Sequence, residues 1–118
     1  MQKKEEFEGF IERLRKASEE KIVLVEGAKD KNALESLGVK NIMTLKKPLY
    51  AVVEDIVSSG KDCVILTDLD KKGKEIYARV SSKLKQSGVK VDNRFREFLF
   101  ETRLRQIEGI ISYLGKLT

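Results

Sequence analysis

Three acidic residues stand where two apolar segments of the sequence end. Glu26 and then Gly27 follow "KIVLV", whereas Asp68 and Asp70 follow "DCVILT" in a stretch that closes with Gly73. Carboxylate oxygens are the ligands that Mg²⁺ and Mn²⁺ accept, and clustered carboxylates repel one another unless a cation neutralises them. The three acids are therefore candidate metal ligands. The glycines beside them would let the backbone turn sharply and a phosphate approach closely.

Each acid also has a purely structural explanation. An Asp after a strand often caps the next helix by accepting backbone N–H groups, so Asp70 could cap a helix that starts near Lys72. Glu26 could simply be solvated. For any single acid this explanation is the stronger one. For all three acids together with their glycines, the metal site is favoured.

The composition excludes several classes of site. The chain has no His and a single cysteine, Cys63, which rules out the usual zinc sites, His-based catalytic triads and an internal disulfide. The apolar neighbours of Cys63 indicate a buried thiol. The net charge of +5 and the pI of about 9.3 permit an anionic partner such as nucleic acid, although a Lys-rich surface explains them equally well.

Size and charge content set further expectations. A chain of 118 residues is expected to form one domain. Charged residues make up 36% of it, and Lys and Glu enrichment without His or Trp suggests a heat-adapted protein. The sequence contains no signal peptide and no apolar run long enough to span a membrane, which predicts a cytoplasmic protein without a membrane partner.

Helical and strand patterns alternate along the chain. Residues 2–18 place Phe7, Phe10, Ile11 and Leu14 on one helical face. Strands are predicted at 21–27, 41–45, 62–68 and 89–92, the last of them short. Helices are predicted at 28–38, 49–59 and 72–88, ending near Gly38, Gly60 and Gly88, with Pro48 opening the second of them. Residues 93–118 are apolar at helical spacings and predict one or two more helices.

This alternation predicts an α/β fold of three layers, with a mainly parallel four-stranded sheet and helices on both faces. Residues 21–95 would form the core, with 1–20 as an amphipathic helix packed on it and 96–118 as a helical extension of the same domain. Ligands bind such sheets beyond the carboxyl ends of the strands, where the strand order reverses. Two predicted strands end in acids at that edge.

The motifs "VLVEG" at 23–27 and "VILTDLDKKG" at 64–73 resemble the Toprim family, which is shared by topoisomerases, primases and some nucleases. That family carries Glu-Gly after its first strand and Asp-x-Asp after a later one, and the resemblance covers roughly residues 20–95. It implies a Rossmann-like Toprim fold with Glu26 as general acid/base or metal ligand. Asp68 and Asp70 would bind one or two Mg²⁺ ions, with Mn²⁺ as a substitute, for phosphodiester transfer.

The sequence departs from the topoisomerase form of the family. Lys72 stands where an acid usually precedes the last glycine, and no separate domain carries a nucleophilic tyrosine. Tyr50, Tyr77 and Tyr113 lie in apolar helical patterns and are expected in the core or at its boundary. Topoisomerase and primase activities are therefore not expected. The chain is more similar to small Toprim proteins of archaea and bacteria related to ribosomal-RNA maturase nucleases.

Basic residues follow both acidic motifs. Lys29 and Lys31 come after Glu26, and the aspartates are followed by Lys71, Lys72 and Lys74. The residues predicted to bind a nucleic-acid backbone are Gly27, Lys29, Lys71, Lys72, Gly73 and Lys74, and Lys31 would rim the same edge. For the arginines of the C-terminal part, substrate contact and plain solvation are equally good explanations: Arg94, Arg96, Arg103 and Arg105. Phe95, Phe98 and Phe100 are expected in the core, so no aromatic stacking platform is predicted.

The leading hypothesis is a Mg²⁺-dependent hydrolase or transferase of nucleic-acid phosphodiesters, with RNA slightly preferred to DNA and a role in RNA processing. The alternative is a module that binds metal and nucleic acid without turnover, within a larger complex with a protein partner. A third class, the phosphate-accepting receiver domain, fits poorly. Receivers place their acid pair after the first strand and a lone Asp after the third, the reverse of the order found here.

Overall fold

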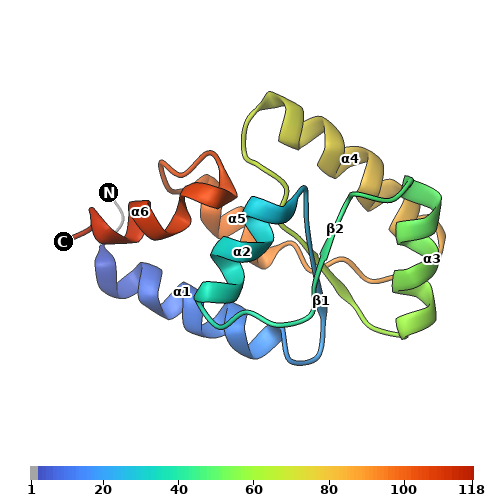
Figure 1. Cartoon of the computed structure of the whole chain (residues 1–118), viewed down its shortest axis with the longest axis horizontal. Coiled ribbons are helices and arrows are strands. Elements are labelled where there is room, and N and C mark those ends of the chain that lie inside the picture. Colours follow the sequence, from blue (N-terminus) through green and yellow to red (C-terminus); the bar gives the residue numbers. More distant parts are fainter. Residues whose placement is uncertain (1–2) are drawn as a thin grey trace.

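The centre of the fold is a small parallel sheet, seen in Figure 1 in a computed structural model that describes residues 3–118. Its strands are β1 (Ile22–Val25), β2 (Ile42–Thr44) and β3 (Cys63–Ile65), in the order β2-β1-β3. Val23 of β1 is in register with Ile42 of β2 and with Val64 of β3. The central strand β1 is therefore the place where the strand order reverses.

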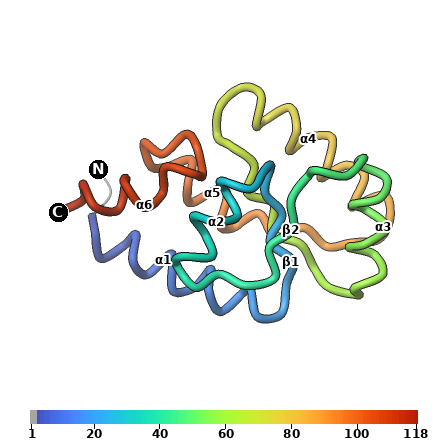
Figure 2. Tube along the Cα trace, viewed as in Figure 1, coloured from blue at the N-terminus to red at the C-terminus, as the bar shows by residue number. Residues whose placement is uncertain are grey.

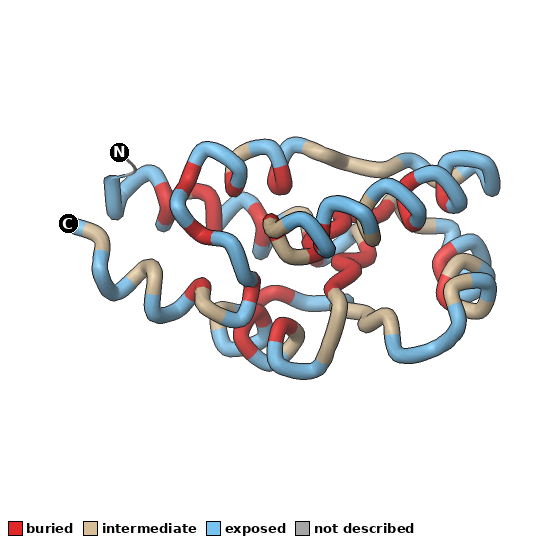
Figure 3. The backbone as a smooth tube through the Cα atoms, turned by 90° about the horizontal axis from the view of Figure 1, so that it is seen from above, coloured by how far each residue is buried: buried red, intermediate tan, exposed pale blue. Residues whose placement is uncertain are grey.

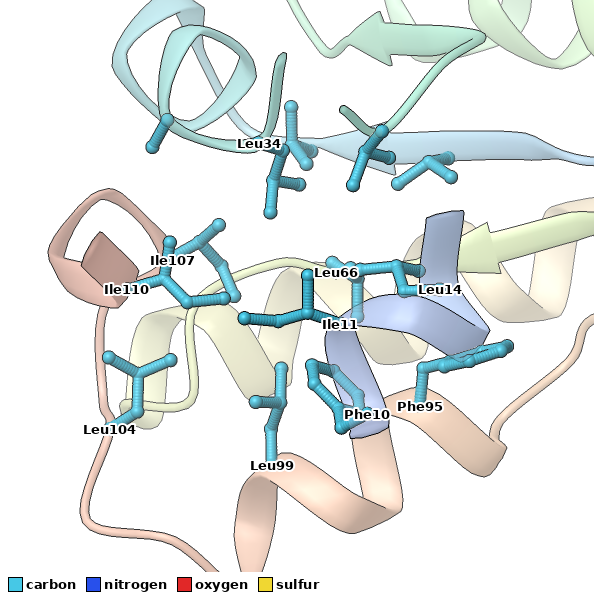
Figure 4. Close-up of a cluster of buried hydrophobic side chains, with 14 of the residues drawn as sticks. Phe10, Ile11, Leu14, Leu34, Leu66, Phe95, Leu99, Leu104, Ile107 and Ile110 are labelled. Atoms are coloured by element: carbon cyan, nitrogen blue, oxygen red, sulfur yellow. The ribbon is translucent and has the colours of Figure 1, made fainter. Parts of the chain in front are cut away.

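Every residue of β1 and β3 is buried because helices cover both faces of the sheet. Val23 and Val25 face one hydrophobic cluster with α1 (Lys4–Ala17), α2 (Ala28–Ser36), α5 (Arg94–Phe100) and α6 (Ile110–Gly115). Ile22 and Leu24 point to a second cluster with α3 (Leu49–Ser59) and α4 (Lys71–Gln86). Figure 4 shows the first cluster, and Figure 3 shows buried residues along the middle of the molecule. The predicted α/β class is confirmed.

Helix α1 packs on the core along the face that the sequence predicts. Phe7, Phe10, Ile11 and Leu14 are all buried, and the Phe10 ring stacks on that of Phe98 with centroids 4.6 Å apart. The amide of Lys4 donates a hydrogen bond to the carbonyl of Thr118 at 3.4 Å. The two ends of the described chain therefore lie side by side, as the tube in Figure 2 shows.

The predicted helix boundaries are largely confirmed. Helix α3 begins after Pro48, its N-cap, and ends at Gly60, whose φ of 69° is left-handed. Gly38 and Gly88 likewise have positive φ just beyond α2 and α4. The C-terminal part forms α5, a 3₁₀ turn η1 (Ile107–Gly109) and α6. Among the described residues, no helix is long and apolar enough to cross a membrane.

The sheet is smaller than the predicted four strands. Within residues 3–118, the segment expected as the fourth strand makes only an isolated parallel bridge, between Val91 and Cys63. Cys63 bonds Lys90 and Asp92 through its N–H and C=O, at 2.9 and 2.8 Å, and the chain then turns into α5. Strand β3 is also shorter than predicted, because the backbone of Thr67 and Asp68 bonds side chains instead of a neighbouring strand.

Two aromatic residues lie further outside than the sequence suggests. Tyr50, expected in the core or at its boundary, has 70% of its surface exposed. Phe100, expected in the core with Phe95 and Phe98, is 39% exposed, whereas Phe95 is buried. Apolar spacing within such short segments does not resolve which of the apolar residues of a helix stay exposed.

Candidate functional site

Glu26 and Asp68 meet at the carboxyl edge of the sheet, where β1 and β3 lie next to each other. The carboxylate oxygen Oε2 of Glu26 accepts a hydrogen bond from the amide of Asp68 at 2.7 Å. One residue pair earlier, the amide of Leu66 bonds the carbonyl of Leu24 at 2.8 Å, which continues the β1–β3 pairing. The structure thus brings together residues 42 positions apart, at the point where parallel sheets bind ligands.

Asp68 and Asp70 are held by different partners. The Oδ1 atom of Asp68 accepts from the amide of Ile107 in η1 at 2.9 Å, which ties the site to the C-terminal segment. The chain then bends at Leu69 and Asp70. Asp70 is the N-cap of α4, and its Oδ1 accepts from the amide of Gly73 at 2.8 Å. The extended conformation that would align the two aspartates does not persist, and the capping explanation holds for Asp70.

Leu69, between the two aspartates, anchors the loop that carries them. Its side chain is buried in the cluster against α1, and its amide donates to the carbonyl of Arg105 at 2.7 Å. The sequence Asp-Leu-Asp therefore alternates two polar residues with one core residue. This anchor fixes where Asp68 stands relative to the strand edge.

Gly73 has a different task from the sharp turn that the sequence suggests. It lies buried in the first turn of α4, and a Cβ atom added to it would stand 1.9 Å from the carbonyl oxygen of Asp68. The hydroxyl of Thr67 donates to its carbonyl at 2.8 Å. Glycine is needed here for the close approach of α4 to the end of β3. Gly27, by contrast, is extended, and a Cβ atom added there would meet nothing within 4 Å, so a glycine is not required.

Arg96 of α5 joins this loop from the side. Its guanidinium donates to the carbonyls of Thr67 and Asp68 at 2.6 and 3.1 Å, and the whole residue is buried. The same group lies over the rings of Tyr77 and Phe100, at 4.7 and 5.0 Å from their centroids. Burial lowers the pKa of Arg96, but an arginine stays charged in proteins. Arg96 therefore belongs to the site, whereas Arg94 pairs with Asp92 elsewhere.

Asp30 and Glu108 are acids of this site that the sequence interpretation missed. Asp30 is buried in the first turn of α2 and accepts from the amide of Gly27 at 3.1 Å. Burial raises its pKa, and so, to a smaller extent, do the charges of Asp68, Glu26 and Glu108, while the Gly27 bond opposes them. An acid in the first helical turn after Glu-Gly was a readable signal. Glu108 had none, because only tertiary packing brings η1 to this edge.

The electrostatics of Asp68 follow the same pattern. Burial raises its pKa, the charges of Asp70 and Glu108 raise it further, and the Ile107 amide and Arg96 lower it. Within residues 3–118, none of the ion pairs involves Glu26, Asp30, Asp68, Asp70 or Glu108. The edge of the sheet thus carries carboxylates that side-chain cations neutralise only from a distance.

The predicted metal ligands fit a hydrated ion better than a closed cage. In the described chain, no group of three or more acids or cysteines stands close enough to enclose a metal ion. In each predicted ligand, Glu26, Asp68 and Asp70, one carboxylate oxygen accepts a hydrogen bond from a backbone amide. Within residues 3–118, the other oxygen of each accepts no protein hydrogen bond. Mg²⁺ commonly takes one or two carboxylates and keeps several waters. The donor types therefore suit a hydrated Mg²⁺ or Mn²⁺ ion, and Glu26 lies next to Asp68 through the backbone amide of Asp68.

The predicted basic rim is exposed. Lys29, Lys71, Lys72 and Lys74 all lie on the surface, whereas Lys31 is half-buried. Three of them occupy the first turn of α4, which contains no acid. A helix N-terminus carries a partial positive charge, so lysines there are unfavourable unless an anion approaches. Lys74 also lies over the Phe100 ring, 5.5 Å from its centroid.

Comparisons with known proteins place the chain among its relatives. No model of a protein family matches it. A UPF0292 protein of Methanocaldococcus jannaschii is 33% identical over 112 residues, which cover 90% of this chain and 88% of that protein. One from Pyrococcus abyssi is 37% identical over 105 residues, 88% of this chain and 78% of that protein. The solved structure of an Aquifex aeolicus protein aligns with a TM-score of 0.82 and 35% identity, over 86% of this chain and 94% of that one. This chain belongs to the UPF0292 family.

Proposed function

We propose that this protein is a Mg²⁺-dependent hydrolase or transferase of nucleic-acid phosphodiesters, of the Toprim type and with RNA as the preferred substrate. The observation that carries the proposal is the contact between Glu26 and Asp68, which brings two distant motifs to the β1–β3 edge with 2.7 Å between Oε2 and the amide. Acids gathered at a ligand-binding edge, two of them with raised pKa, are typical of functional sites.

The proposal assigns separate tasks to the residues around this contact. The oxygens of Glu26 and Asp68 that accept no backbone bond would hold the ion, which supplies charge stabilisation at the phosphate. Asp70 fixes the first turn of α4, so that Lys71 and Lys72 face an approaching phosphate. Glu26 is the candidate general acid/base. Lys29, beyond β1, extends the basic rim on the other side.

The Toprim version of the fold is part of the same proposal. The order β2-β1-β3 with parallel pairing supports it, as does the position of Glu-Gly after β1 and of Asp-Leu-Asp after β3. In this view the Lys90–Asp92 segment, bonded to Cys63 on both sides, is a fourth strand reduced to its minimum.

The test is cleavage of end-labelled structured RNA, single-stranded DNA and duplex DNA by the purified chain with Mg²⁺, with Mn²⁺ and with EDTA. Metal-dependent cleavage is expected, and Asp68→Asn should abolish it while leaving the fold intact, because the amide oxygen still accepts the Ile107 bond. Asp62→Asn is the matched control. Asp62 precedes the same strand at its opposite end, and its loss should leave the rate unchanged. Cleavage by Asp68→Asn at the parental rate would contradict the proposal.

A second candidate is the non-catalytic module that binds metal and nucleic acid. The observation in its favour is that each predicted ligand already accepts a backbone hydrogen bond, so all three stabilise the loop structure. The same panel separates the two candidates. Binding of the labelled strands by the chain, without any metal-dependent cleavage product, would establish the non-catalytic module.

A further inference from the structure

A pocket of about 220 Å³ lies beside the acidic edge, between the first turn of α4 and helix α5. Its lining comes from α4, from the residue before α5 and from α5 itself: Lys74, Tyr77, Asn93, Arg96, Glu97 and Phe100. The volume is below the roughly 300–1,000 Å³ that encloses a whole drug-sized ligand. A single flat ring system is therefore the natural occupant.

The walls of this pocket present flat surfaces. The guanidinium of Arg96 lies over the rings of both Tyr77 and Phe100, and Phe100 keeps 39% of its surface exposed. Unpaired nucleobases stack on aromatic rings and on arginine planes in this way. Phe100, partly exposed and contacted by the cations of Arg96 and Lys74, therefore offers aromatic surface to a bound base and is not a residue of the core.

Polar groups at the rim match the edge of a base and its phosphate. The side-chain Oδ1 of Asn93 accepts from the Tyr77 hydroxyl, so the side-chain NH₂ of Asn93 is left as a donor. The Glu97 carboxylate beside it is an acceptor. Lys74, another lining residue, belongs to the first turn of α4, which also carries Lys71 and Lys72. A base inside would place its phosphate toward these lysines.

Arg96 connects the pocket to the acidic site. Arg96 is one of the residues that line the pocket, and its guanidinium N–H groups bond the carbonyls of Thr67 and Asp68. A ring bound in the pocket would therefore rest on the residue that holds the Asp68 loop. The pocket and the acidic edge share this one rigid element.

We propose that this pocket binds the base of an unpaired nucleotide, with its phosphate on the lysines of α4. The inference deepens the proposed function, on which it rests for the class of substrate. It assigns the pocket to single-stranded or flipped-out nucleotides. An intact duplex, whose bases are all paired, would not bind in it. Stacking on Phe100 contributes affinity that does not depend on the salt concentration. The contact of Lys74 with the phosphate contributes affinity that salt weakens.

The absence of tryptophan from the chain gives a direct test. Phe100→Trp places the only tryptophan of the chain in the pocket, and Tyr50→Trp places it instead on α3, where the tyrosine is 70% exposed, so that selective excitation of tryptophan reports on each position. Single-stranded RNA and DNA decamers, titrated in EDTA so that no cleavage occurs, should quench the first variant saturably and leave the second unchanged. Matching duplexes should quench neither. The RNA and DNA arms show which sugar is preferred.

Binding of labelled decamers to Phe100→Ala completes the test. Its affinity for single strands should fall about tenfold, with an unchanged salt dependence, because the lost contact carries no charge. Lys74→Ala should instead lower the salt slope by about one, and Lys85→Ala, at the other end of α4, should leave affinity and slope unchanged. Unquenched Phe100→Trp, equal quenching by duplexes or absence of binding by the parent chain would overturn the inference.

These outcomes are separable from those of the cleavage test. Quenching by single strands without metal-dependent cleavage would support the pocket and contradict the proposed catalysis. Cleavage by a parent chain whose Phe100→Trp variant is unquenched would contradict the pocket alone. A folded state of each variant, checked by circular dichroism, makes a loss of binding attributable to the ring that was changed.

Discussion

Asp92, at the amino end of the sheet, and Asp68, at its carboxyl end, are both half-buried acids with opposite surroundings. Asp92 accepts from Lys21 at 2.8 Å and from the Arg94 guanidinium at 2.8 and 3.0 Å. These bonds, that of Arg94 first, hold its pKa well below the usual range. Burial raises the pKa of Asp68, and the charges of Asp70 and Glu108 raise it further, although the amide of Ile107 opposes them.

The difference separates a structural carboxylate from a candidate functional one. Asp92 fastens the segment before α5 to the start of β1, and its charge is compensated within the protein. The charges of Asp70 and Glu108 raise the energy of ionised Asp68. The charges of Asp68 and Glu108 do the same to ionised Asp30. A site kept in this state is ready for a cation or a proton from outside. Variants at the two ends should therefore respond differently to pH and to Mg²⁺.

The largest effect is expected from Gly73→Ala. The new Cβ would meet the backbone carbonyl of Asp68 at 1.9 Å, and backbone cannot move aside as a flexible side chain can. We expect the free energy of unfolding to fall by about 3 kcal/mol or more in urea titrations. Gly27→Ala is the control, because its Cβ meets nothing within 4 Å. Equal stability of the two variants would contradict the close approach of α4 to the acidic loop.

Local patterns in the sequence predicted most of the frame on which this comparison rests. The helical face of α1, the apolar β1 and β3, and the glycines beyond α2, α3 and α4 depend on neighbours in the chain, and all were found. The fourth strand failed because Lys90–Asp92 is too short to do more than bond Cys63. Whether a segment pairs as a strand depends on the length and position of the neighbouring strand, which the sequence of the segment itself does not reveal.

The site was predicted in part for the same reason. Glu26 and Asp68 could be paired in advance, because adjacent parallel strands end at one edge. The cap formed by Asp70 was one of two open explanations. Glu108 and the Arg96 contacts arise only when α5 and η1 fold back on the loop, and the exposure of Phe100 depends on the rotation of α5. Those facts belong to tertiary packing.

At the amino end, Asp92→Asn should destabilise the protein by about 1.5–3 kcal/mol at pH 7, the range for hydrogen bonds to charged groups. The pKa of Asp92 is lowered in the folded state, so its contribution is fully present above the ordinary value and is lost as the pH falls toward the lowered one. Urea titrations at several pH values should show the gap between parent and variant closing on acidification. A constant gap would contradict the ion pairs.

At the carboxyl end, Mg²⁺ should stabilise the parent chain. A ligand that binds only the folded state at ten times its Kd adds about 1.4 kcal/mol to the free energy of unfolding. Asp68→Asn should lose most of this gain and Asp62→Asn should keep it, in thermal melts at constant ionic strength. Identical shifts in the parent and in Asp68→Asn would remove Asp68 from the proposed metal ligands.

The smallest effect carries the clearest sign. Without metal, the free energy of unfolding of Asp68→Asn at pH 7 should equal that of the parent or exceed it by about 0.5 kcal/mol or less. That of Asp92→Asn should be lower than the parent's. The pKa of Asp68 is raised in the folded state, so the folded chain binds more protons than the unfolded one. Parental stability therefore falls as the pH rises from the ordinary carboxyl value through the raised one, and the variant escapes that loss. Urea titrations of parent and variant from pH 3 to pH 7 would show the two curves together at the acid end and separating above it. A lower free energy of unfolding for Asp68→Asn than for the parent at pH 7 would mean that the protein itself stabilises the charge of Asp68, as it does that of Asp92.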